Sequence, residues 1–203
     1  GYEPYNAIAQ TNGLVHLGCW AHCRRYFNDA LQALPKDRRG PDQLSARFID
    51  LIGQLYRVEA LARQRGVGAQ ELHQLRQRDS VPVLAQIESL LVSHLHGVLP
   101  ASLLGKALYY LSGQWSKLTR YVEDGRYPID NNPCENAIRP FVVGRRNWLF
   151  SDTVAGANAS ANLYSLLQTC QLNGIDGYRY LRELLFALPL ARTADDYEAL
   201  LPW

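Results

Sequence analysis

The pattern that most constrains the fold of this chain is a long run of helical periodicity between residues 42 and 123. Apolar residues recur there at steps of three and four, which places them on one face of an α-helix. We expect one helix from Leu44 to near Gly66, a second over Ala69–Arg78, a third capped by the Ser80 hydroxyl, and a fourth over Pro100–Glu123. No sequence repeat relates these helices, which argues against a solenoid.

Helices are also expected on both sides of this block, whereas the signal for strands is slight. The same spacing predicts helices at Tyr5–Gln10, Trp20–Leu34, Asn132–Arg139, Ala157–Asn173 and Asp176–Leu188. Leu14–Leu17 is expected to be a buried strand, and Phe141–Val143 and Trp148–Phe150 are expected to pair as a hairpin after Pro140 ends the preceding helix. A single strand cannot form a sheet, so its partners should lie in that hairpin or upstream of Gly1. The predicted fold class is mainly α, with the chain an α+β fragment.

Composition limits what the chain can be. Hydrophobic residues make up 47% and charged residues 20%, as in a soluble globular protein, and no apolar run reaches the roughly 18 residues that a membrane span needs. A net charge of +2 is too small to indicate a nucleic-acid partner by itself. Four scattered cysteines do not make a disulfide scaffold, which favours reduced thiols in a cytosolic protein. The chain contains no methionine, and we interpret it as a piece of a longer protein.

The densest group of chemically active side chains is DNNPCEN, at 130–136. Asp or Asn at a helix start usually caps backbone donors, and capping is the simpler interpretation for any one of these residues. Capping does not account for Glu135 inside the first turn, followed by Arg139 one turn later. Magnesium binds through one or two carboxylates together with substrate phosphates, so Glu135 is a candidate metal ligand.

A basic and aromatic cluster follows, made of Arg139, Arg145, Arg146, Asn147 and Trp148. Arginine pairs with phosphate in bidentate geometry, and tryptophan offers a stacking face, so the cluster is suited to nucleic acid. A solvated hairpin tip with a core tryptophan explains the same residues equally well.

Three potential soft-metal ligands lie near the start of the chain. Cys19, His22 and Cys23 are spaced to share one face of a helix. Only three ligands lie close together, whereas a structural zinc site needs four. We therefore expect the thiols to pack as small hydrophobic side chains and the chain to bind no stoichiometric zinc.

Several segments resemble the insertion sequence 66 family of bacterial transposases. They are GYEPYN at 1–6, GCWAHCRRYF at 18–27, DNNPCENAIRPFVVGRRNWLF at 130–150, and LYSLLQTCQLNG together with the terminal LLPW. The resemblance covers essentially the whole chain, and the block at 130–150 is its most specific part.

This resemblance implies a partial ribonuclease H-like core and a DDE motif, in which two aspartates and a glutamate hold Mg²⁺ or Mn²⁺ for DNA strand cleavage and transfer. By position the glutamate is Glu135, in both a catalytic and a metal-binding role. The second aspartate would directly precede Gly1 and the first would lie further upstream, so this fragment is expected to be inactive and to bind no metal tightly. The implied regions are a core remnant at 1–30, a helical insertion at 31–125, the glutamate and arginine segment at 126–155, and a C-terminal helical segment at 156–203.

The resemblance also implies the partners. They are DNA, as transposon ends and target, together with accessory transposition proteins and an oligomeric complex, in the bacterial cytoplasm at the nucleoid and without a membrane. The residues expected to contact DNA are Arg24, Arg25, Arg139, Arg145, Arg146 and Asn147. The alternative is a non-catalytic helical module that binds DNA or a protein. The two interpretations overlap, because a transposase fragment without the two aspartates would bind DNA and leave it uncut.

Overall fold

The computed structural model describes residues 4–149 and 151–203, and it divides into two compact units, Gly1–Pro133 and Cys134–Trp203. The aspartate expected directly before Gly1 and the end of the expected hairpin at Phe150 lie outside the described residues. Each unit is helical, and the described residues contain no strand, which confirms the mainly α class. They offer no confirmation of a ribonuclease H-like core. None of their helices combines the length and apolar character that a membrane crossing requires.

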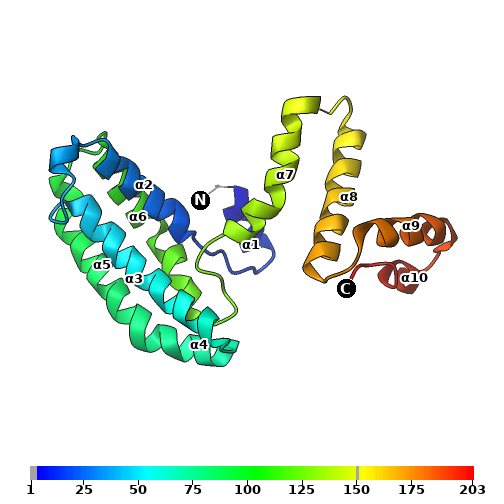
Figure 1. Ribbon diagram of the computed structural model, residues 1–203, viewed down its shortest axis with the longest axis horizontal. Helices are drawn as coiled ribbons and strands as arrows, with labels where there is room; N and C mark the ends of the chain where they lie inside the picture. Colours follow the sequence, from blue (N-terminus) through cyan, green and yellow to red (C-terminus); the bar gives the residue numbers. More distant parts are fainter. Residues whose placement is uncertain (1–3, 150) are drawn as a thin grey trace. The chain divides into compact units, whose positions relative to one another are not determined.

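The first unit is built around a bundle of four helices. Figure 1 shows α2, α3, α5 and α6 side by side. The unit contains α1 (Pro4–Thr11), α2 (Trp20–Gln32), η1 (Lys36–Arg38), α3 (Leu44–Arg65), α4 (Ala69–Leu75), η2 (Arg76–Ser80), α5 (Val81–His94), η3 (Leu95–Gly97), α6 (Leu103–Leu118) and η4 (Thr119–Glu123). The turn η2 is π-helical, and the other three short turns are 3₁₀ helices.

Large apolar side chains from these four helices make the core of the first unit. Phe27 of α2 stacks on Phe48 of α3 with ring centroids 4.4 Å apart, and both rings are fully buried. Trp20 is also fully buried, and its indole N–H donates to the Leu118 carbonyl at 2.8 Å. The apolar stripes recognised in the sequence therefore form the core, since Phe48, Leu55, Leu108 and others from those stripes are inaccessible to solvent.

Two local predictions in this unit are wrong. Residues 14–17 are not a strand: Leu14 is 58% exposed, and no neighbouring strand supplies the ladder that a strand requires. Ser80 does not cap a new helix, because the backbone runs without a break from α4 through η2 into α5. Its hydroxyl is buried inside that run instead.

The second unit is smaller, and its described residues form four α-helices. They are α7 (Asn132–Trp148), whose first two residues belong to the first unit, α8 (Val154–Leu172), α9 (Gly177–Ala187) and α10 (Ala194–Glu198), with the 3₁₀ turn η5 (Leu188–Leu190). Asp176 caps α9, and Gly174 ends α8 with a φ of 68°, the left-handed conformation predicted for a glycine there. The terminal segment is fixed by Asn173 and Tyr180, which donate to the carbonyls of Pro202 and Leu200.

Candidate catalytic segment

The candidate metal ligand Glu135 lies in the first turn of α7, on a helix that begins at Asn132 as predicted. Arg139 and Arg146 follow it at steps of four and eleven residues, which correspond to one and three helical turns. All three side chains therefore belong to one face of α7. Arg139, Arg145, Arg146 and Asn147 are all exposed.

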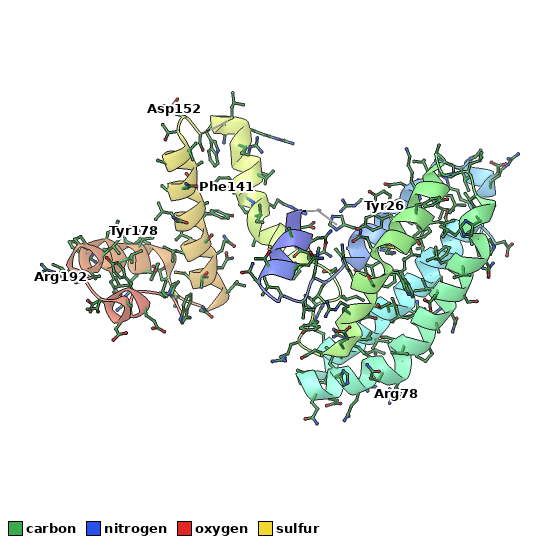
Figure 2. All side chains as sticks on the ribbon, turned by 180° about the vertical axis from the view of Figure 1, so that it is seen from behind. Tyr26, Arg78, Phe141, Asp152, Tyr178 and Arg192 are labelled. Carbon is green, nitrogen blue, oxygen red and sulfur yellow. The ribbon has the colours of Figure 1, made fainter. Side chains whose placement is uncertain are left out.

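The opposite face of α7 is aromatic and packs on α8. Phe141, labelled in Figure 2, lies on this face. Its ring centroid is 5.3 Å from that of Tyr164 of α8 and 5.6 Å from that of Trp148. The Trp148 ring covers Gly144, where an added Cβ would overlap the ring atoms. Trp148 stays 50% exposed, so it is not the core tryptophan of a hairpin tip. Packing on one side and arginines on the other make α7 a two-faced helix.

The predicted hairpin at 141–150 is wrong within the described residues, because α7 continues through Pro140 to Trp148. Proline removes one helical N–H, so the Asn136 carbonyl loses its normal donor, and this loss usually ends or kinks a helix. Here the Tyr164 hydroxyl of α8 donates to the neighbouring Ala137 carbonyl at 2.7 Å. This bond and the aromatic packing of Phe141 hold α7 against α8 on both sides of the proline. Arg139 before the proline and Arg146 after it therefore belong to the same helix.

The paired helices α7 and α8 carry an excess of positive charge. Glu135 is the one acidic residue of α7 against three arginines, and α8 contains no charged residue. A cavity of about 410 Å³ lies where the two helices meet, lined by Phe141, Trp148, Asp152 and the first turns of α8. The Thr153 hydroxyl caps α8 by accepting from the Gly156 N–H at 3.0 Å. Arg139, Arg145 and Arg146 therefore outnumber the two acids of this helix pair and its connection, Glu135 and Asp152.

The other acid of the motif, Asp130, is used to hold the chain. Its carboxylate accepts from the Tyr56 hydroxyl at 2.8 Å, from the Asn132 backbone N–H at 3.0 Å and from the Asn132 side chain at 2.9 Å. Burial and this hydrogen bond raise the pKa of Tyr56 far above its usual range, which keeps the phenol a donor. Asp130 therefore fixes the segment that leads into α7, as the capping interpretation predicted for such a residue.

The thiols near the start of α2 have separate roles. Cys23 is fully buried in the core, and burial raises the pKa of its thiol far above the usual range, so it does not supply a thiolate. The Cys19 sulfur accepts the Asn131 backbone N–H at 3.4 Å. His22 is partly buried beside it, with a ring nitrogen within 4.8 Å of that sulfur. Cys23 thus packs as a small hydrophobic residue, and the absence of zinc stays a prediction.

Arg24 and Arg25 are both exposed on α2 of the first unit. Sequence reasoning placed these arginines but missed Tyr56 and Tyr164, whose hydroxyls hold the chain before and after Glu135. Tyr56 is 74 positions from Asp130 and Tyr164 is 27 from Ala137, so no local pattern connects either pair.

Comparison with known proteins gives consistent matches along the chain. The family described as "Transposase IS66 family" matches residues 1–159, and the IS66 C-terminal element matches residues 165–203. Three uncharacterized proteins of Sinorhizobium fredii (strain NBRC 101917 / NGR234), y4qI, y4jD and y4hP, are 33%, 29% and 30% identical to it over 100% of this chain. The chain covers 38%, 40% and 38% of these curated relatives, so it spans about two fifths of their length.

No solved structure matches the chain. The two family matches together cover nearly every residue, including Glu135 and the arginine face of α7. The chain belongs to the IS66 family of transposases.

Proposed function

We propose that the protein containing this chain cleaves and transfers DNA strands in a metal-dependent reaction, and that Glu135 supplies one carboxylate ligand of the metal site. The observation that carries the proposal is the shared face of α7, which places Glu135 in line with Arg139 and Arg146. At about 1.5 Å of rise per residue, the arginines follow Glu135 by about 6 Å and about 16 Å along the helix axis. That length is comparable to about five nucleotide steps of a DNA strand.

The chemistry of the Glu135 carboxylate fits Mg²⁺ or Mn²⁺. A carboxylate is a hard oxygen donor of the kind that these ions bind through one or two protein ligands plus substrate phosphates. Asp130 already accepts three hydrogen bonds, from Tyr56 and Asn132. We therefore infer that further carboxylates of the longer protein complete the site. When bound, the metal supplies activation of the attacking oxygen and stabilisation of the leaving one.

The arginine face has its own role in this proposal. Arg139 and Arg146 would neutralise backbone phosphates and set the register of the DNA, while making no contact that depends on sequence. Arg145 and Asn147 extend the exposed polar surface at the end of α7. Accessory transposition proteins, an oligomeric complex and a place at the bacterial nucleoid are part of the same proposal.

The test uses the full-length protein and labelled transposon-end DNA with Mg²⁺ or Mn²⁺. We expect Glu135→Gln to abolish cleavage while leaving duplex binding and the thermal melt unchanged, because the amide keeps the shape and loses the anionic ligand. Glu198→Gln, on α10 of the same unit, is the matched control and should cleave like the parent. Cleavage by Glu135→Gln at the parental rate would rule out the assigned role.

The alternative, a non-catalytic module, is favoured by one observation. The arginine excess on α7 does not depend on a metal, so the helix pair can bind DNA by itself. Full-length protein that binds end DNA through these arginines but never cleaves it, with either metal, would support this alternative.

A further inference from the structure

A pocket lined by tyrosines lies on the first unit between α2 and α6, far along the chain from the catalytic segment. It is a shallow cavity of about 380 Å³ lined by Tyr26, Pro100, Lys106, Tyr109 and Tyr110. Tyr26 and Tyr110 stack with centroids 4.6 Å apart and an interplanar angle of 28°. Figure 2 labels Tyr26 on α2. Nothing in the role proposed for α7 uses these residues.

The rings present aromatic surface to solvent. Tyr26 is 41% exposed and Tyr109 is 44% exposed, whereas the neighbouring Ala107, Leu108 and Leu111 are fully buried. The core of the bundle is therefore complete without the outer faces of these tyrosines. Within the described part of the chain, no hydrogen bond is made by the hydroxyls of the three tyrosines that line the pocket. An aromatic ring with one face packed and the other accessible is suited to stacking on a flat ligand.

Lys106 is the one charged residue that lines the pocket. Lys106 precedes Tyr109 and Tyr110 by three and four residues, so it shares their side of α6. Arg24 and Arg25 are exposed on α2 just before Tyr26, and α6 contains no acidic residue. The one acid of α2 is Asp29, one turn after Tyr26. A ligand that combines a flat aromatic part with an anionic part fits this arrangement.

We propose that the pocket of Tyr26, Tyr109 and Tyr110 binds an unpaired nucleotide of single-stranded DNA. The base stacks on the tyrosine rings, and the phosphate is held by Lys106. Stacking tolerates any base, since every base has a π-face, so the pocket recognises unpaired DNA and not a sequence. This inference rests on the proposed function to the extent that the bound strand is the DNA on which the transposase acts.

The experiment measures binding of the 203-residue chain to fluorescent oligo(dT) by anisotropy, beside a hairpin duplex of equal length. We expect Tyr26→Leu and Tyr109→Leu each to weaken oligo(dT) binding by about 5- to 150-fold, the effect of losing one base stack. Tyr26→Phe keeps the ring and should bind like the parent. Tyr178→Leu, an 81% exposed tyrosine of α9, is the matched control and should also bind like the parent.

The charged part of the pocket has a separate readout. Lys106→Ala should lower the salt slope of oligo(dT) binding by about 0.7, the value for one phosphate contact on a single strand. Duplex affinity should change little in the tyrosine variants. If Tyr26→Leu and Tyr109→Leu melt like the parent and bind oligo(dT) with parental affinity, the inference is overturned.

The two proposals fail in different ways. Loss of oligo(dT) binding in the tyrosine variants supports the pocket even if full-length Glu135→Gln still cleaves. Parental oligo(dT) binding in those variants removes the pocket and leaves the metal role of Glu135 untouched.

Discussion

A buried ion pair in the first unit gives the sharpest stability prediction. Arg76 in the π-helical turn η2 is nearly inaccessible, and its guanidinium donates to both oxygens of Glu59 at 2.8 Å. Its remaining nitrogen donates to the carbonyls of Tyr121 and Asp124, at 2.7 and 2.8 Å. The guanidinium also lies over the Tyr121 ring, 4.9 Å from its centroid. Arg76 therefore fixes the beginning of the loop that leads to Asp130 and α7.

The magnitude follows from what a truncation leaves behind. Arg76→Ala would strand the Glu59 carboxylate, whose side chain is 10% exposed, without a cation. Removing one partner of a buried pair typically costs about 3–5 kcal/mol. Replacing both partners, as in Arg76→Met with Glu59→Leu, removes the stranded charge and should cost much less. Both variants also remove the donor to the Tyr121 and Asp124 carbonyls, so that loss is common to the two.

The assay is urea and thermal unfolding of the chain, followed by circular dichroism. We expect Arg76→Ala to lower the melting temperature by about 10 °C or more, since about 1 kcal/mol shifts a unit of this size by several degrees. Arg78→Ala is the matched control, because Arg78 pairs with Asp79 on the surface with its side chain 69% exposed, and it should change little. The reasoning is refuted if Arg76→Ala melts like the parent, or if the double variant is as unstable as the single one.

Four further outcomes are expected. The double variant Arg139→Ala/Arg146→Ala should weaken duplex binding equally for specific and random DNA and lower the salt dependence of that binding by about two units of slope. The control Arg192→Ala should leave both unchanged. An unchanged slope in the double variant would show that these arginines do not contact DNA. The isolated chain with Mg²⁺ or Mn²⁺ should not nick end DNA, and reproducible metal-dependent nicking would disprove this. Metal analysis of protein purified without chelator should find no stoichiometric zinc, whereas about one zinc per chain, lost on Cys19→Ser, would contradict this. Burial raises the pKa of Tyr121 to about 12, above its ordinary value of 10. The stability that the neutral phenol contributes is therefore complete below pH 10 and is lost as the pH rises to about 12. In a series of thermal melts at alkaline pH, Tyr121→Phe should reduce this loss of stability.

Helices with a continuous apolar stripe were predictable from the sequence. The stripe of α3 begins at Leu44 and its end is marked by Gly66, which takes the left-handed φ of 64° expected of a glycine after a helix. The turn η2 was not predictable in the same way. Ser80 followed by Pro82 is a normal start signal, and only the tertiary contacts of Arg76 explain why the backbone passes through without a break.

The start of the catalytic segment was also predictable, and its end was not. The motif at 130–136 placed a helix start at Asn132 and Glu135 in the first turn, and α7 confirms both. Pro140 predicted a stop, because local sequence rules count the donor that proline removes and not the packing against another helix on both sides of it. The Tyr164 hydroxyl comes from 27 residues further on, so the outcome depends on packing that the sequence pattern of α7 does not contain.

The stretch 181–190 shows a second kind of limit. Periodicity predicts a helix over Asp176–Leu188, and in the structure Leu184 is 8% exposed while Leu185 is 65% and Phe186 74% exposed. Periodicity identifies which side chains are apolar and which share a face, but burial also requires an opposing surface. Four helices in a 70-residue unit supply such a surface for one side of α9 and not for the other, because a chain of this size buries a smaller fraction of its area than a larger domain does. The arginine face of α7 escapes this limit, since a charged surface needs only solvent to form.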